Sequence, residues 1–329
     1  MRPDRGTDTV AKGRPSPNAE HSLALRAAWL HYVGGLRQAD VAKRLEVPSV
    51  KAHRLIQKAV SEGAVKVSIE GDIVDCIELE AALCQRFGLQ TCEVAPHLEE
   101  EGLPLRALGN AGASWLRRCL ERGEDLTIGL SHGRTLAAAV QNLPHMYLPQ
   151  QRFVSLLGGL TRKFAANPHD VMHLLAEKTG AQSYVMPVPF FANSADDREV
   201  LLAQRGIPEV LQMAEAASLK LVGVGTVSLE AQLVAAGLIE SREIEAISAE
   251  GGLGEMLGHF FDEDGNFVDT PLTKRTIAAS LHNRAQRADR IIALAGGPQK
   301  VAAIRAVLNS GQLSGLITDE RTAQSLLEG

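Results

Sequence analysis

QADVAKRLEVPSVKAHRLIQ, residues 38–57, is the stretch of the chain with the clearest fold signal. Its apolar residues fall where the two helices of a helix-turn-helix contact each other. These residues are Val41, Ala42, Leu45, Val47, Ala52 and Leu55. Ala42 is small where the helices must cross, and Leu45 and Leu55 fill the wedge between them. The pattern predicts helices over about 37–45 and 49–62, joined by a tight turn.

The turn between these helices departs from the usual pattern at two residues. Glu46 stands where glycine is usual, and a left-handed backbone there costs an L-residue about 1 kcal/mol. Pro48 replaces the usual serine cap, but proline is tolerated in the first turn of a helix. After Gly63, residues 64–69 alternate like a strand, which predicts a wing beside the two helices.

The charge distribution indicates nucleic acid as the partner of this segment. Residues 1–68 carry 12 Lys and Arg against 6 Asp and Glu, whereas the remainder carries 22 against 33. A basic head on an acidic body favours DNA binding over the alternative, a three-helix packing module that binds no DNA. The second helix would then enter a major groove. We expect the DNA-binding residues to be Ser49, Val50, Lys51, His53, Arg54 and Gln57.

Length and composition are those of an ordinary globular protein with two domains. The chain has 329 residues, of which 45% are hydrophobic and 22% are charged. It has neither an apolar run near the ~20 residues that span a bilayer nor the apolar core of a secretory signal, so we expect a cytoplasmic protein. The four cysteines form no CxxC pair, and the histidines show no ligand spacing. We therefore expect no metal site and no cofactor.

The texture changes after Gly71, where short β-branched runs end in glycine and are followed by helical stretches. A helix over about 73–87 is expected to open this part of the chain. Strands that alternate with helices predict a mostly parallel, doubly wound α/β sheet. Ligands in such sheets bind beyond the carboxyl ends of the strands, which is where these glycines lie. The expected strands are 126–130, 153–157, 221–224, 290–295 and 316–318.

One of these strand ends has the features of an anion site. Residues 127–136 read TIGLSHGRTL, which is a strand, a glycine-containing loop and the start of a helix. Backbone N–H groups at a helix start bind anions, and Gly133 lets the backbone approach a ligand closely. Ser131 and Thr135 offer hydroxyl groups, and Arg134 offers positive charge. The loop alone leaves phosphate binding and a simple turn equally open.

Both parts of the chain resemble the SorC-type sugar-responsive transcriptional regulators. In the first part the family pattern is present as Trp29-Leu30-His31-Tyr32, Gln38, Ala42-Lys43-Arg44-Leu45, Arg54-Leu55-Ile56 and Gly63-Ala64-Val65. In the second it is present as residues 127–136, Leu156-Leu157-Gly158-Gly159, Gly223-Val224-Gly225-Thr226, Gly254-Glu255, Ala295-Gly296-Gly297-Pro298-Gln299-Lys300 and Thr318-Asp319-Glu320. The succession covers about residues 25–327. His53 and His132 stand where the family usually has serine and tryptophan.

The resemblance implies a winged helix-turn-helix followed by a doubly wound α/β effector domain similar to phosphosugar isomerases and deaminases. In this family the loop around Gly133 holds the phosphate of the effector. The resemblance also implies Lys300 as a point charge on that phosphate, Glu255 as an acceptor for ligand hydroxyl groups, and dimers or tetramers on operator DNA. We expect the ligand-binding residues to be Ser131, His132, Gly133, Arg134, Thr135, Gly159, Glu255 and Lys300.

Three segments are therefore expected: a disordered leader over 1–20, a DNA-binding domain over 21–70, and an effector-binding and oligomerisation domain over 71–329. The expected function is regulation of a carbohydrate-utilisation operon by a sugar or polyol, in phosphorylated form, without enzymatic activity. One alternative is a sugar-phosphate isomerase or deaminase, for which no catalytic constellation is recognisable. Another is a structural oligomer. The residues leave open which sugar it is and whether it is phosphorylated, the operator, repression or activation, and dimer or tetramer.

Overall fold

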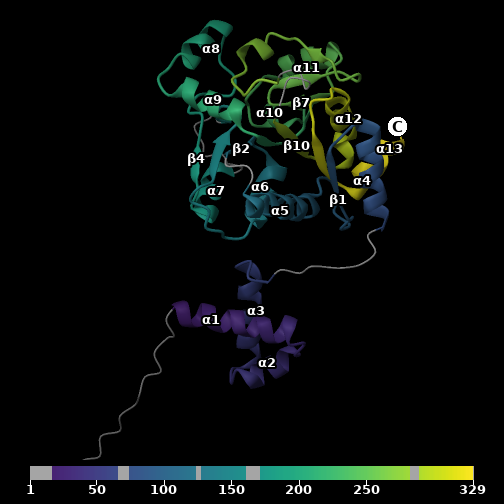
Figure 1. Cartoon of the computed structure of the whole chain (residues 1–329). Coiled ribbons are helices and arrows are strands. Elements are labelled where there is room, and N and C mark those ends of the chain that lie inside the picture. The colour runs from purple at the N-terminus through teal and green to yellow at the C-terminus, as the bar shows by residue number, and fades with distance from the viewer. Residues whose placement is uncertain (1–16, 66–73, 124–126, 161–170, 282–288, 329) are drawn as a thin grey trace, which may run out of the picture. The chain divides into compact units, whose positions relative to one another are not determined.

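Residues 1–71 and 72–329 form two compact units. The computed structural model describes residues 17–65, 74–123, 127–160, 171–281 and 289–328. The described part of the first unit contains helices and turns, and every described strand lies in the second unit (Figure 1). A small helical unit thus precedes a large α/β unit along the chain.

The first unit is a set of short helices around a small apolar core. Its helices are α1 (Pro17–Ala28), the π-helical turn η1 (Trp29–Val33), α2 (Gln38–Arg44) and α3 (Ser49–Ser61). Val41, Ala52 and Leu55 are fully buried in this core, and Leu45 and Val47 are half-buried at its rim. The predicted helix-turn-helix is confirmed, and α2 and α3 end within one residue of the expected bounds.

The turn between α2 and α3 contains the strained residue that the sequence predicts. Glu46 has φ 53°, in the left-handed region that favours glycine. Val47 N donates to Ala42 O at 3.0 Å and closes the turn. Pro48 then adopts an extended conformation immediately before α3. The helix-turn-helix therefore forms with a glutamate in its tightest position.

The two ends of this unit are only partly described. Helix α1 begins at Pro17, so the expected leader extends four residues too far along the chain. Proline is favoured at the first helical position, and Glu20 in the first turn complements the helix dipole. Ala64 and Val65 follow α3 without strand structure. Residues 1–16 of the leader and 66–69 of the expected wing lie outside the described residues.

A seven-stranded parallel sheet forms the centre of the second unit. Its strands are β1 (Thr91–Ala95), β2 (Thr127–Leu130), β3 (Arg152–Ser155), β4 (Gln182–Tyr184), β5 (Leu219–Val222), β10 (Arg290–Leu294) and β11 (Gly315–Asp319). The order is β1-β11-β10-β5-β2-β3-β4, and each neighbouring pair is parallel. From β2 the chain runs outward to β3 and β4, then returns to β5 and runs outward on the other side. The predicted doubly wound sheet is confirmed.

Helices cover both faces of this sheet. Successive apolar side chains along a strand point to opposite faces, so each face has apolar surface to bury. The described α-helices of the second unit are α4 (Val74–Phe87), α5 (Leu105–Arg122), α6 (Arg134–Asn142), α7 (Val171–Thr179), α8 (Ala195–Leu202), α9 (Ile207–Ala216), α10 (Gln232–Ala235), α11 (Ser241–Ala249), α12 (Val301–Asn309) and α13 (Glu320–Glu328), and those named below pack on the sheet. Phe153 and Leu221 belong to a core that includes α5, α6 and α7. Their neighbours Val154 and Val222 belong to a second core that includes α4, α12 and α13.

A small antiparallel sheet follows β5 in the chain. Its strands, in the order β6-β7-β8-β9, are β6 (Gly225–Thr226), β7 (Gly254–Met256), β8 (His259–Phe261) and β9 (Phe267–Val268). Two short 3-10 turns, η2 (Thr273–Arg275) and η4 (Pro298–Lys300), complete the second unit as described. Within the described ranges, no helix is both long and apolar enough to cross a membrane.

Candidate functional site

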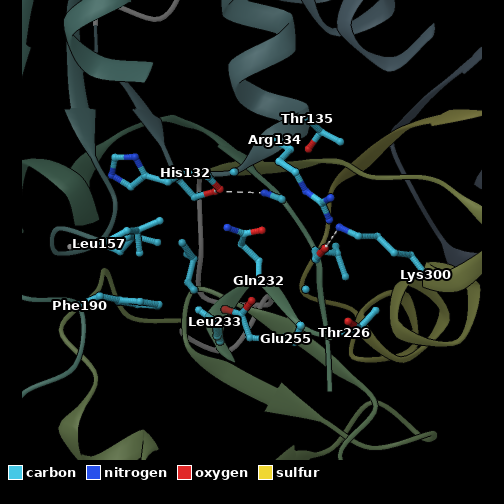
Figure 2. Close-up of a pocket in the computed structure, with 18 of the residues that line it drawn as sticks. His132, Arg134, Thr135, Leu157, Phe190, Thr226, Gln232, Leu233, Glu255 and Lys300 are labelled. Carbon is cyan, nitrogen blue, oxygen red and sulfur yellow. Dashed lines mark hydrogen bonds between the residues drawn. The ribbon is translucent and has the colours of Figure 1, made fainter. Parts of the chain in front are cut away.

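A pocket lies at the carboxyl ends of β2 and β5, where the direction of the sheet order reverses. The chain leaves β2 toward β3 and leaves β5 toward the opposite side, so the loops after these two strands diverge. Ser131 directly follows β2, and Gly223 directly follows β5. Both line the pocket, together with Lys300 from the segment after β10 (Figure 2). Doubly wound sheets bind ligands at this place.

The loop after β2 presents the first turn of α6 to the pocket. Ser131 N donates to Leu221 O at 3.0 Å, and Ser131 Oγ accepts from Gly223 N at 3.1 Å, so Ser131 joins the two loops. Gly133 has φ 137° and ψ 166°, a conformation that L-residues rarely adopt. Because the first N–H groups of a helix have no intrahelical partner, this loop can hold an anion.

Two cationic side chains line the same pocket. Arg134 is the first residue of α6, and Lys300 ends η4 after β10. Lys300 Nζ donates to Val224 O at 2.6 Å, which holds it at the end of β5 (Figure 2). Burial lowers the pKa of Lys300 to about 8; the Arg134 cation contributes to this decrease, and Glu255 opposes it. An anion bound between the two cations would stabilise both of them.

Glu255, in β7, lines the pocket with a carboxyl group of unusual protonation behaviour. Its Oε1 accepts from Gly258 N at 2.7 Å. A Cβ at Gly225 would lie only 2.4 Å from Glu255 Oε2, so the glycine allows this close approach. Burial raises the pKa of Glu255 to about 7, while the Gly258 N–H and the Lys300 cation lower it. Near neutral pH this carboxyl group can both donate to and accept from ligand hydroxyl groups.

The structure brings seven of the eight predicted ligand-binding residues to the pocket: Ser131, His132, Gly133, Arg134, Thr135, Glu255 and Lys300. Their roles toward a ligand remain a prediction. Gly159 does not line the pocket. It pairs with Pro189 in an isolated bridge, and its N–H donates to Val188 O at 2.8 Å. The backbone of Gly159 therefore connects two loops, and its contact with a ligand stays a prediction.

Thr135 and His132 have structural partners that leave their side chains less free for a ligand. Thr135 Oγ1 donates to Leu294 O at 3.0 Å, which ties α6 to β10. His132 Nε2 lies 3.3 Å from Ser155 Oγ, and its ring is turned away from Arg134 and Lys300 (Figure 2). The hydroxyl of Thr135 and the ring of His132 therefore support the shape of the loop.

The rest of the pocket lining was not predicted from the sequence. It includes an apolar wall formed by Leu157, Leu160, Phe190, Leu233 and Leu257. It also includes Gln232, the first residue of α10. Helix α10 has four residues, too few for a helical period to be recognised. The glycines at 223 and 225 marked the loop before it, but no motif marked Gln232.

The first unit presents the side chains that were predicted to contact DNA. Five of them, Ser49, Val50, His53, Arg54 and Gln57, are exposed on α3, and Lys51 is half-buried. The buried face of the same helix consists of Ala52, Leu55, Ile56 and Ala59. The two sets alternate with a helical period, so α3 has one face in the core and one face free of it. DNA contact by this exposed face remains a prediction.

Arg54 forms an ion pair within the first unit. Its Nη2 lies 3.2 Å from Glu20 Oε1 on α1, and the Arg54 side chain is 69% exposed. Exposed pairs of this kind contribute about 0–1 kcal/mol, so Glu20 orients Arg54 without sequestering it. His21 and Lys58 make similar surface contacts to Glu62.

Comparison with known proteins connects both units to one group of regulators. Residues 71–328 match the model of a sugar-binding domain family. The chain is 63% identical over 310 residues to the erythritol catabolism regulatory protein EryD of Brucella abortus, covering 94% of this chain and 98% of that protein. It is 32% identical over 313 residues to the transcriptional regulator LsrR of Klebsiella pneumoniae, covering 94% of each chain.

Solved structures agree with this result. The full-length sorbitol operon regulator SorC of Klebsiella pneumoniae is similar with a TM-score of 0.68 and 26% identity, and the match covers 94% of this chain and 99% of SorC. A DeoR family transcriptional regulator from Listeria monocytogenes is similar in fold with a TM-score of 0.69 at 24% identity, covering 76% of this chain and 99% of that chain. The match to SorC includes both the helical unit and the α/β unit.

Proposed function

Because the chain belongs to the SorC-type family of sugar-binding transcriptional regulators, we propose that it controls an operon for polyol catabolism in response to a phosphorylated polyol of the erythritol class. The name of EryD supplies the polyol class. Binding to operator DNA and assembly into a dimer or tetramer belong to the same proposal. Such a regulator acts in the bacterial cytoplasm.

One observation carries the phosphate part of this proposal. Arg134, Lys300 and the first turn of α6 line a single pocket at the carboxyl end of the sheet. A helix start and two cations together favour a dianion far more than a neutral sugar. Glu255 would repel a phosphate placed against it, so the phosphate is expected on the Arg134 side and the polyol hydroxyl groups on the Glu255 side.

The switch depends on differential binding. The protein has one arrangement that binds operator DNA well and another that binds it poorly, and the phosphorylated polyol stabilises one of them. The relatives are named as regulators, which supports a sensor rather than an isomerase or deaminase. The sign of the response, repression relieved or activation promoted, is read directly from an operator gel shift with and without the polyol phosphate.

The test is a calorimetric titration with erythritol 4-phosphate, erythritol and inorganic phosphate, combined with an operator gel shift. Lys300→Met keeps most of the aliphatic stem and removes the charge. It should weaken erythritol 4-phosphate binding by about 10- to 150-fold, as expected for a lost hydrogen bond to a charged group. DNA binding without ligand should persist.

Lys274→Met is the matched control, because Lys274 is exposed on η2 and does not line the pocket. It should bind and respond like the wild type. If the wild type binds free erythritol more tightly than its phosphate, the phosphate assignment is wrong. Conversion of erythritol 4-phosphate into another compound during the titration would support an enzyme instead.

A further inference from the structure

The pocket has a polar side chain that neither the anion-binding loop nor Glu255 accounts for. Gln232 lines the pocket from α10, on the chain segment between β6 and β7. Figure 2 shows its carboxamide directed into the cavity, between the level of Arg134 and that of Glu255. Among the described residues, no hydrogen-bond partner of the Gln232 carboxamide is found. A donor and an acceptor are therefore available at the middle of the pocket.

The backbone beneath Gln232 is held in place although its side chain is exposed. The residues on either side, Ala231 and Leu233, are only 3% and 9% exposed. Gln232 O accepts from Ala236 N at 2.9 Å, and Ala235 N donates to Ala231 O at 2.9 Å. The carboxamide therefore projects from an anchored turn, and binding a ligand there orders one flexible side chain without ordering a loop.

The chemistry of the neighbours decides what Gln232 can recognise. A carboxamide carries no charge, so it adds little to the hold on a phosphate that Arg134 and Lys300 already provide. Leu233 and Phe190 lie in the same lining and offer only apolar surface. A hydroxyl group both donates and accepts, and the carboxamide matches both roles at once. The part of the ligand that reaches Gln232 is therefore a hydroxylated carbon beyond the phosphate.

We propose that Gln232 is a specificity-determining residue that reads a hydroxyl group of the effector's carbon chain. This inference rests on the proposed function, since it assumes that the phosphate occupies the Arg134 and Lys300 side. Gln232 selects polyol phosphates over phosphates that lack hydroxyl groups, and it is indifferent to the phosphate itself. Lys300, in contrast, holds every phosphate alike.

The test uses three probes that share the phosphate and differ in the group attached to it: inorganic phosphate, n-butyl phosphate and erythritol 4-phosphate. Gln232→Met preserves length and flexibility while removing the hydrogen-bonding groups. The substitution should lower the affinity for erythritol 4-phosphate by about 2- to 12-fold, as expected for the loss of one neutral hydrogen bond. Affinity for inorganic phosphate and for n-butyl phosphate should stay within about twofold of the wild type, below the effect of one hydrogen bond, which also shows that the pocket remains folded.

The control is Glu230→Gln, an exposed change two residues away that is outside the pocket lining. It should leave all three affinities unchanged. Gln232 does not read the hydroxyl group if Gln232→Met binds erythritol 4-phosphate as tightly as the wild type, or if its affinity for all three probes falls equally. In either case this inference fails and the proposed function stands. If the wild type binds none of the probes, the proposed function fails and this inference fails with it.

Discussion

Lys300 combines a half-buried position with a hydrogen bond to the backbone of the neighbouring loop. Its Nζ is held by Val224 O at 2.6 Å, and it shares the pocket with one cation and one carboxyl group. A lysine on the solvated side of a helix would have neither feature. A lysine in this setting titrates within reach of ordinary buffers, because burial and Arg134 both favour its neutral form and lower its pKa.

The affinity for phosphate ligands should therefore fall as pH rises through about 8. The pKa of Lys300 is about 8, so its ammonium group is mostly present at pH 7 and mostly absent at pH 9.5. The phosphate monoester is already a dianion above about pH 6, and Arg134 keeps its charge throughout. Glu255, with a pKa of about 7, becomes fully ionised over the same pH range, and its negative charge lowers the affinity for the phosphate further.

Calorimetric titration of erythritol 4-phosphate at pH 7 and pH 9.5 measures this effect, and about a tenfold loss is expected for a hydrogen bond to a charged group. Because Lys300→Met has no ammonium group to lose, its smaller affinity should show a shallower decline that reflects Glu255 alone. An equal decline in both proteins would show that Lys300 does not titrate against the ligand.

The residues of the pocket differ in how well the sequence predicts them. Ser131 to Thr135 are adjacent in one strand–turn–helix motif, so local rules place them together. Lys300 and Glu255 come from distant segments, and only family resemblance connected them to that loop. Gln232 reaches the pocket from a helix too short to show a periodic pattern. Gly159 differs from them, since its backbone forms a bridge outside the pocket lining and its contact with a ligand stays a prediction.

At the scale of the elements, the helix-turn-helix is the part that the sequence predicts most closely. Its apolar spacing, its turn and its buried residues all agree with the structure, because short-range packing rules decide them. Strands β2, β3, β5, β10 and β11 were also predicted, mostly from β-branched runs followed by glycine. Edge strands β1 and β4 were not, and neither was the strand order, because these depend on pairing between segments far apart in the chain.

The strained turn at Glu46 offers a direct test of this description. Glu46→Gly removes the cost of a left-handed L-residue, about 1–2 kcal/mol, and adds unfolded-state entropy of about 0.4–1 kcal/mol. The first unit should become more stable by about 0.8 kcal/mol, the difference between the midpoints of these two ranges. Hydrogen exchange of the α2 and α3 amides, followed by mass spectrometry, measures the change within this unit.

A glycine in a right-handed position supplies the control. Lys43→Gly lies within α2 and is exposed, so it should destabilise the same amides by about 1 kcal/mol. If Glu46→Gly lowers protection as much as Lys43→Gly does, the left-handed turn is absent in solution.

Helix α3 is the element expected to enter the major groove, and Arg54 is its exposed arginine. Arg54→Ala should weaken operator binding by about 1–3 kcal/mol if it reads a guanine, and should relax the preference at that base pair. Glu20→Gln removes the ion-pair partner and should change operator affinity by less than about 1 kcal/mol. Gel-shift titrations on the operator and on single-base variants measure both effects. Unchanged affinity in Arg54→Ala would place another face of α3 against DNA.

At the scale of the whole chain, sequence composition already separates the two activities. The net positive charge lies in residues 1–68 and the net negative charge in the remainder, so electrostatic attraction to DNA is confined to one part of the chain. The pocket lies in the second unit, and mutations there are expected to leave DNA binding without ligand unaffected.

Assembly is the last prediction, and it rests on two requirements of a regulator. A single recognition helix makes too few base contacts for tight and selective binding, so such units pair on related half-sites. The response to ligand has its own requirement. Moving an equilibrium from 1:99 to 99:1 takes about 5.5 kcal/mol of differential affinity, which is more than one small ligand readily supplies and which two or four pockets can share.

Light scattering of the full chain at micromolar concentration should therefore give at least the mass of a dimer, with and without operator DNA. The ligand response should be steeper than one-to-one binding, because the pockets of one assembly act on a common equilibrium. A monomer in both conditions would contradict this prediction. A dimer with a strictly hyperbolic response would keep the pairing on DNA and rule out the sharing of the switching free energy among its pockets.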